Sequence, residues 1–411
     1  MSNHSMIRIT KELSGIQKGS DLSIAVACRD VDVRNVKAII IGPSDTPYEF
    51  GFFEIDPRDS TWRGESGEEW SSAQGLESIL ISIQSLMSSN PYENEPGFED
   101  LKEPQDKKNQ KDYVDKIRHE TIRISVIQKL EEYLGILPNG VWVNENLASS
   151  RSVTPDAIDD LDTTGDESSV AWFPFKDFCK RRFIWYYDSY LLAISKAKEG
   201  VKDGQQFIRM PFEGQGNDMS GKFNYGELER RLKTIKTVLD KETQRWPAEA
   251  LTAKTKDTGV WVNLQRQYEQ VVEAYKRDPS KTLDIELVDK NPFEWSITIF
   301  GRPMTNLDGG LFIVKLYFSP RFPEEQPRAR FETQLFHHRI ATDGTPCYTA
   351  TRVEDVKSHV DAILEALEEE SPPYDPRTMV NPEAAKMYWG SPDDRKNYNR
   401  KLRRAVQRST E

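Results

Sequence analysis

The stretch that decides the fold of the last third of the chain is "NPFEWSITIFGRPMTNLDGGLFIVKLYFSPRFPEEQPRARF", residues 291–331. Its apolar runs "FEWSITIFG" and "LFIVKLYF" are separated by the turn signal "NLDGG", and another run, "TLDIELV", precedes them across "KNP". Runs of β-branched and aromatic residues bounded by Gly, Pro and Asn predict strands joined by tight turns. Short connections of this kind favour an antiparallel meander.

Helices are predicted on both sides of the meander. Before it, "WVNLQRQYEQVVEAYKRDPS" places Leu264, Tyr268, Val271 and Tyr275 on one stripe, which predicts an amphipathic helix that ends near Pro279. After it, "EDVKSHVDAILEALEEE" and the basic stretch "DRKNYNRKLRRAVQR" repeat apolar residues at helical spacing. The sequence therefore predicts an α+β domain here, and the charges of the last helix are interpreted as a solvated face.

Composition divides the chain into segments. Residues 149–169 have no apolar periodicity and a run of acids, which predicts a disordered acidic linker. A second linker is predicted at 247–259. These leave a first domain at 1–148, a helical segment at 170–246 with leucines at helical spacing, and the domain at 260–411.

Bulk properties exclude several classes of protein. A net charge of −11 disfavours a nucleic-acid partner, and no run approaches the roughly 18 apolar residues of a membrane span. The first residues lack the layout of a signal peptide. The three cysteines, Cys28, Cys179 and Cys347, lie far apart, which indicates reduced thiols and a cytosolic or nuclear location. Cys179, among aromatic residues, is interpreted as packing. No Cys or His cluster suggests a metal site.

An internal repeat links the two ends of the chain. "GPSDTPYEFGFF" (42–53) and "GRPMTNLDGGLF" (301–312) align without a gap, matching two glycines, a threonine, an acid and an aromatic residue. Each copy leaves a strand at Gly, makes a turn and resumes a strand at the aromatic residue. Two related domains are expected.

These residues resemble the ubiquitin-conjugating enzyme fold. In that family a helix leads into a four-stranded antiparallel meander, then a His-Pro-Asn motif, then a cysteine eight positions after the Asn. Here "HHR" (337–339) stands at the motif, and Cys347 follows Arg339 by eight positions. "ESPPYDP" resembles the family's gate segment, whose acid would be Asp375.

The N-terminal part resembles the large, Z-type conjugating enzymes, in "IIGPSDTPYEFGFFE" and "EEWSSAQGLESILISIQSLMSSNPYENEPGFE". Only eight residues, 54–61, separate Phe53 from Trp62, where the C-terminal copy has 34 between its matching aromatic residue and its cysteine. The first copy is therefore expected to lack the third and fourth strands and the active-site cysteine. Cys28 lies upstream, in the expected first strand, and cannot substitute. Degeneration and a mis-joined exon both explain the gap.

The resemblance implies a function. The protein would carry ubiquitin or a ubiquitin-like modifier as a thioester on Cys347 and transfer it to lysine, without metal or small-molecule cofactor. Its partners would be the modifier, an activating enzyme and a ubiquitin ligase, with no nucleic acid and no membrane. His337, His338 and Arg339 would favour the thiolate if they face it. Arg339 would also take the place of the oxyanion-stabilising Asn, and Asp375 would help to deprotonate the acceptor amine.

The same residues admit structural interpretations. A cysteine after a "DG" turn can simply pack, His337 and His338 can satisfy backbone groups, and Asp375 can be a turn acid. The alternative function is a catalytically inactive scaffold of the same fold that binds ubiquitin or a conjugating partner. A buried Cys347 sulfur would favour the scaffold, and an accessible one faced by Arg339 the enzyme.

Overall fold

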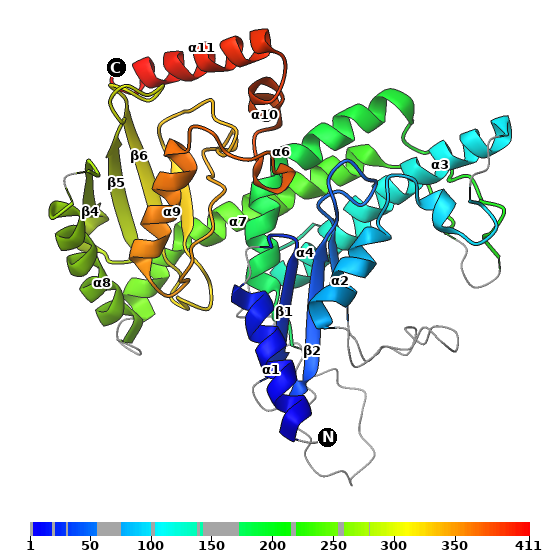
Figure 1. The fold of residues 1–411 in the computed structure, drawn as a ribbon, viewed down its shortest axis with the longest axis horizontal. Helices are drawn as coiled ribbons and strands as arrows, with labels where there is room; N and C mark the ends of the chain where they lie inside the picture. The colour runs from blue at the N-terminus through cyan, green and yellow to red at the C-terminus, as the bar shows by residue number, and fades with distance from the viewer. Residues whose placement is uncertain are drawn as a thin grey trace. The chain divides into compact units, whose positions relative to one another are not determined.

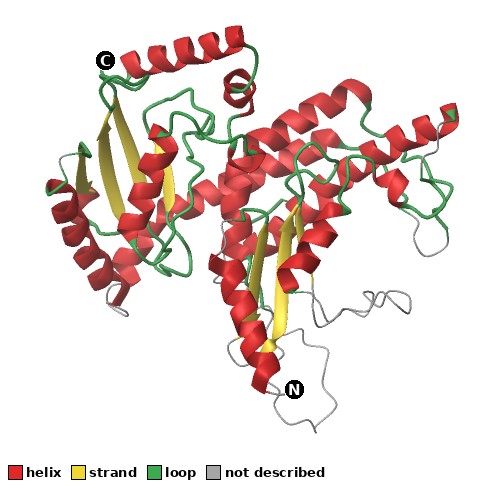
Figure 2. Cartoon of the chain, in the orientation of Figure 1, coloured by secondary structure: helices red, strands yellow, loops and turns green. Residues whose placement is uncertain are grey.

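The computed structural model has two compact units (Figures 1 and 2). The first comprises Met1–Cys179 and Ala197–Val238, and the second comprises Lys180–Lys196 and Leu239–Glu411. The structure describes residues 3–18, 21–29, 32–55, 75–99, 103–137, 140–142, 172–214, 219–253, 259–278 and 280–411. The predicted linker 149–169 lies outside these residues.

The first unit is built on a three-stranded antiparallel sheet in the order β1-β2-β3. Its first elements are α1 (Asn3–Lys18), β1 (Ile24–Arg29), β2 (Asp32–Ile41), β3 (Phe52–Ile55) and α2 (Leu76–Ser85). The core joins one face of the sheet to both helices, with Leu13, Ile40 and Leu80 all buried. Alternation along β1 and the apolar stripe of α1 produce this packing.

One expectation for this unit was wrong. The third strand is present as β3, although it has four residues where the corresponding strand of the second unit has seven. It pairs with β2, with Phe53 opposite Ile40. The strand resumes at the aromatic end of the Gly42 turn, and half of β3, Phe52 and Phe53, precedes the short interval 54–61. Cys28 lies in β1, as expected.

The first unit continues with a run of consecutive helices. They are α3 (Pro104–Glu120), the π-helix η3 (Thr121–Gln128) and α4 (Lys129–Leu134), preceded by the short helix η2 (Pro91–Asn94). The η3 helix approaches the β2–β3 turn closely, because a Cβ on Gly51 would lie 2.6 Å from Ser125 Oγ and 2.7 Å from Thr121 Cγ2. Only glycine fits this contact.

The predicted helical segment contains α6 (Lys176–Gly200) and α7 (Tyr225–Ala253), and each helix contributes residues to both units. The structure differs from the predicted linker at 247–259. The α7 helix continues through Pro247 to Ala253, in a stretch rich in alanine, the strongest helix former. The next helix begins at Gly259, and 254–258 lie outside the described residues.

The second unit is an α+β domain with a four-stranded antiparallel sheet in the order β4-β5-β6-β7, as the meander predicted. Its elements are α8 (Gly259–Lys276), β4 (Leu283–Leu287), η5 (Val288–Lys290), β5 (Glu294–Phe300), β6 (Leu311–Tyr317), β7 (Arg328–Phe331), α9 (Val356–Glu368), η6 (Pro376–Thr378), α10 (Pro382–Tyr388) and α11 (Pro392–Arg408). In Figure 1, α8 and α9 flank the sheet. Trp295 is fully buried in the core of this unit, and the α11 stripe Tyr398, Leu402 and Val406 packs into the same core.

The β5–β6 turn has a fixed hydrogen-bonding pattern. The Gly301 amide donates to the Gly310 carbonyl at 2.8 Å, and the Gly310 amide donates to the Leu307 carbonyl at 3.0 Å. Thr305 Oγ1 donates to the Arg302 carbonyl at 2.7 Å. A Cβ on Gly301 would lie 1.7 Å from the Leu307 carbonyl oxygen, so no other residue fits.

The β2–β3 turn of the first unit repeats this pattern. The Gly42 amide donates to the Gly51 carbonyl at 2.9 Å, and the Gly51 amide donates to the Tyr48 carbonyl at 3.0 Å. Thr46 Oγ1 donates to the Pro43 carbonyl at 2.7 Å. A Cβ on Gly42 would lie 1.7 Å from the Tyr48 carbonyl oxygen. The repeat seen in the sequence thus corresponds to one turn conformation that occurs in both units.

Among the described residues, no helix is long and apolar enough to cross a membrane.

Replacement of Gly42 by Ala should destabilise the first unit by about 3 kcal/mol or more, because the turn backbone must move to admit the Cβ. Gly15→Ala is the matched control in the same unit. Gly15 lies within α1 with no atom within 4 Å of an added Cβ, so alanine should stabilise the helix by about 0.5–1 kcal/mol. Urea unfolding followed by circular dichroism measures both changes. Equal stability of the two variants would contradict the role assigned to the turn.

Candidate active site around Cys347

A compact turn after β7 brings Cys347 back to Arg339. The Cys347 amide donates to the Arg339 carbonyl at 2.8 Å, and Ile340 forms β-bridges with His337 and Pro346. Gly344 holds the tip of the turn at φ +89°, where a Cβ would lie 2.2 Å from the Phe331 carbonyl oxygen. The eight-residue spacing seen in the sequence therefore places Cys347 directly beside Arg339.

The Cys347 sulfur is enclosed. The residue is 2% exposed, and its thiol donates to the Arg377 carbonyl at 4.0 Å. Burial raises the pKa of Cys347 to about 12, against the opposing effect of the positive charges of Arg182 and Arg339. Asp375 adds a smaller effect in the same direction as burial. In this conformation the group at neutral pH is a thiol, which is a poor nucleophile.

The cover over this turn comes from α6, through residues that belong to the second unit. The Thr342 amide and Oγ1 donate to the two carboxylate oxygens of Asp188 at 2.9 and 3.0 Å. Tyr186 is fully buried, and its hydroxyl donates to the Arg377 carbonyl at 3.0 Å. Sequence reasoning did not find this contact. The many aromatic residues of "FIWYYDSY" indicated that this helix is buried. They did not indicate which segment it packs against, because that segment lies more than 150 residues later in the chain.

The two histidines do not act on the sulfur. His337 and His338 are 3% and 1% exposed, and burial lowers the pKa of His337 to about 3 and that of His338 to about 2. The Arg339 amide donates to His337 Nδ1 at 3.2 Å, and His338 Nδ1 pairs with the Tyr398 hydroxyl at 3.2 Å. Both line a polar cavity of about 330 Å³ that Cys347 does not border. Neutral rings held in this way favour the structural interpretation of the pair.

Arg339 lies within electrostatic reach of the sulfur but is held by another group. Its Nη1 forms an ion pair with Glu369 Oε2 at 3.2 Å. Its Nε is buried and has no hydrogen-bond partner among the described residues. The Arg339 charge acts to lower the pKa of Cys347, although burial outweighs it. The guanidinium thus provides a positive charge beside the cysteine.

Asp375 is ionised and bound to Arg377. Its Oδ1 accepts from the Arg377 amide at 3.0 Å and from Nε at 2.9 Å, and its Oδ2 accepts from Nη2 at 2.9 Å. Burial alone would raise the pKa of Asp375, but the hydrogen bonds from Arg377 outweigh it and hold that pKa below its ordinary value. Asp375 influences Cys347 electrostatically. The structure thus brings together three of the four predicted site residues, and His337 is the exception.

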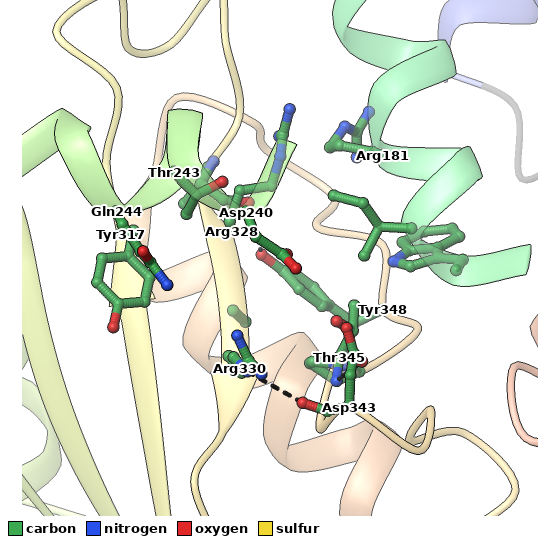
Figure 3. A pocket seen from close by; sticks show the side chains of 15 residues that line it. Arg181, Asp240, Thr243, Gln244, Tyr317, Arg328, Arg330, Asp343, Thr345 and Tyr348 are labelled. Atoms are coloured by element: carbon green, nitrogen blue, oxygen red, sulfur yellow. Dashed lines mark hydrogen bonds between the residues drawn. The ribbon is translucent and has the colours of Figure 1, made fainter. Parts of the chain in front are cut away.

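A cavity of about 70 Å³ lies next to the turn (Figure 3). Its walls come from α6 (Arg181, Trp185), α7 (Asp240), the end of β7 (Arg330) and Tyr348 of the turn. The dashed line in Figure 3 is the 3.0 Å hydrogen bond from Arg330 Nε to the Asp343 carbonyl oxygen. The side chains of α6 and of the turn are therefore not close-packed where they line this cavity.

Within the described residues, no group of three or more His, Cys, Asp or Glu side chains is arranged to hold a metal ion.

The buried histidines predict acid sensitivity. As pH falls below 6.5, the unfolded chain binds protons at His337 and His338, which the folded protein does not bind until about pH 3 or lower. Stability is therefore present above pH 6.5 and is lost as pH falls, by about 1.4 kcal/mol per pH unit for each histidine. His337→Asn should remove one such contribution, measured by urea unfolding between pH 7 and pH 5. An unchanged slope in the variant would contradict the assignment of His337 as a buried neutral ring.

Comparison with known proteins identifies a family and relatives of this chain. The family model described as "Ubiquitin-conjugating enzyme" matches residues 263–406, which contain the meander, Arg339, Cys347 and Asp375. The protein "Ubiquitin-conjugating enzyme E2 Z" of Xenopus tropicalis is 30% identical over 272 residues, covering 57% of this chain and 72% of that protein. Its Homo sapiens counterpart is 29% identical over 269 residues, covering 56% of this chain and 62% of that protein.

A smaller relative matches a shorter part of the chain. "Ubiquitin-conjugating enzyme E2 7" of Triticum aestivum is 32% identical over 157 residues, covering 34% of this chain and 89% of that protein. The likeness to the Z-type enzymes is confirmed by the frog and human relatives. The chain belongs to the ubiquitin-conjugating enzyme family.

Proposed function

We propose that this protein carries ubiquitin, or a related modifier, as a thioester on Cys347 and transfers it to a lysine amine. The observation that carries the proposal is the turn that closes on the Cys347 amide. It gathers Arg339 and the Asp375 segment around one sulfur, and these are the positions that the family resemblance had singled out.

The proposed transfer of the modifier has two steps. In the first, the Cys347 sulfur loses its proton and attacks the thioester carbon of the modifier held by an activating enzyme. The new C–S bond replaces the old one, and the departing thiolate of the activating enzyme takes up a proton. In the second, the lysine nitrogen attacks the same carbon, an amide bond forms, the C–S bond to Cys347 breaks, and the proton lost by the amine passes to the departing Cys347 thiolate.

The residues around the sulfur suit these steps once the sulfur is exposed. Arg339 provides positive charge for the thiolate and for the oxyanion of each tetrahedral intermediate. Asp375 provides a carboxylate that can orient the amine and accept its proton. Because burial raises the pKa of Cys347 to about 12, the sulfur is a neutral thiol at neutral pH, and thioester formation requires a conformation that admits water to the sulfur.

The finer architecture is also a proposal. We infer that the first unit is a truncated copy of the same fold, without a cysteine in the active-site position, and that the second unit is the complete copy. The shared turn conformation and the shared strand order around it support this inference. The expected partners are an activating enzyme and a ubiquitin ligase rather than nucleic acid or membrane, with a location in cytosol or nucleus.

A specific observation favours a second candidate. The 2% exposure of Cys347 and its raised pKa suit a non-catalytic member of the family that binds ubiquitin or a conjugating partner without forming a thioester.

A charging assay distinguishes the two functions. Purified protein is mixed with a panel of activating enzymes, their modifiers and ATP, and is analysed on a non-reducing gel. We expect a slowly formed adduct that reductant removes, that is absent in Cys347→Ala and that becomes a reductant-stable ester in Cys347→Ser. Cys179→Ala, which removes a different buried thiol, should charge like the wild type. If no adduct forms with any activating enzyme, binding of the immobilised modifier by the uncharged protein tests the scaffold.

Asp375→Asn should separate the two steps. The variant keeps the shape of the side chain but loses the carboxylate, so discharge of preformed thioester to free lysine should slow by roughly 10²-fold, while thioester formation changes little. Asp393→Asn is the control, because Asp393 is an exposed acid of α11 that pairs with Lys396. Equal discharge by the two variants would leave Asp375 as a turn acid only.

A further inference from the structure

We propose that the part of α6 around Tyr186 and Asp188 is a built-in inhibitory cover for Cys347, and that the cysteine becomes reactive when the contact between Asp188 and Thr342 opens. This inference rests on the proposed function for its purpose, since only a reactive cysteine needs a cover. The contacts that carry it all lie within the second unit.

The first contact fixes the turn to the helix. Both hydrogen bonds run from Thr342 to the carboxylate of Asp188, at 2.9 and 3.0 Å. Thr342 lies five residues before Cys347 in the same turn, and the turn is itself closed by the Cys347 amide on the Arg339 carbonyl. Any motion that carries the turn away from α6 must therefore break the Asp188 bonds.

The second contact fixes the gate segment. The Tyr186 hydroxyl and the Cys347 thiol both point to one acceptor, the Arg377 carbonyl, at 3.0 and 4.0 Å. Arg377 is bound to Asp375 through its amide and its guanidinium. The side chain from α6 thus holds the segment that carries the proposed gate acid against the sulfur. Tyr186 is a positioning residue in this arrangement, because it acts on Cys347 through Arg377.

This arrangement excludes the reaction. Attack by Cys347 requires a thioester carbon about 3–3.5 Å from the sulfur, with space for the extended C-terminal tail of the modifier and for the departing cysteine. A sulfur enclosed by α6, the turn and the gate segment leaves no such space.

The contact between α6 and the turn can nevertheless open on the side of the turn. Asp188 binds Thr342 at the surface, where water can replace the lost hydrogen bonds. The cavity of about 70 Å³ lies between α6 and the residues that flank Cys347. In contrast, α6 is anchored to α7 by the ion pair of Lys180 with Glu242 at 2.6 Å, in which the Lys180 side chain is 1% exposed. The turn can therefore move away while α6 remains on α7.

Thiol labelling tests the cover without ubiquitin or an activating enzyme. The folded full-length protein is treated with iodoacetamide, and the modification of each cysteine is followed by peptide mass spectrometry. In the wild type, Cys28, which is partly exposed, should react first, and Cys347 should be protected. Asp188→Ala and Thr342→Ala should each raise the rate at Cys347 by about tenfold or more, as expected for loss of hydrogen bonds to a charged group. The double variant should be no faster than the faster single variant, because both act through one contact.

Two controls make the test specific. Glu199→Ala removes an exposed acid from the same helix and should leave Cys347 as protected as in the wild type. Cys179 is fully buried near the start of α6 and reports whether a variant loosens the whole helix.

The proposal is overturned if Cys347 reacts as fast as Cys28 in the wild type. It is also overturned if the Asp188 and Thr342 variants match Glu199→Ala, or if Cys179 and Cys347 gain reactivity together. If the Asp188 and Thr342 variants label faster at Cys347 but form no ubiquitin adduct in the charging assay, the inhibitory cover is supported and the carrier function is refuted.

Discussion

The hydrogen bond from the Cys347 amide to the Arg339 carbonyl is the interaction on which the site depends. It closes a turn whose tip only glycine can form, at Gly344, and so fixes the cysteine opposite the segment of Asp375 and Arg377. Without this hydrogen bond, Cys347 would not be held beside Arg339. With it, they share one small volume at the end of the sheet of the second unit.

Within that volume, burial affects the pKa of Cys347 more strongly than the neighbouring charges do. Two arginines act to lower the pKa of Cys347, yet burial raises it well above its ordinary value. Burial likewise keeps His337 and His338 neutral, whereas Asp375 remains ionised because Arg377 donates to both of its carboxylate oxygens. The ionisation of the Cys347 thiol therefore depends on whether water reaches the site. Exposure would remove burial, the main effect that disfavours the thiolate, and leave the favourable charge of Arg339 in place.

The sequence predicted what depends on local order. Apolar spacing located the helix stripe at Leu264 and Tyr275 and the strands of the meander, because periodicity is a property of neighbouring residues. The resemblance to the family, through its eight-residue spacing, also implied that Cys347 would lie near Arg339. The contacts of Tyr186 and Asp188 with the turn and the gate segment were not predictable in this way, because they join residues 154 to 191 positions apart. The strand β3 was missed because its absence was inferred from the short interval 54–61, whereas its first two residues precede that interval.

The division of α6 and α7 between the units has a consequence for the order of folding. The family match begins at residue 263, yet the second unit also uses Lys180–Lys196 and Leu239 onward, and Asn291 donates to the Pro247 carbonyl at 3.1 Å. During synthesis, α6 leaves the ribosome long before Thr342 and Arg377, so its partners arrive last. Closing loops of this length is slow compared with forming helices or hairpins. A newly made chain therefore passes through a period in which α6 is complete and the thiol of Cys347 is still open to solvent.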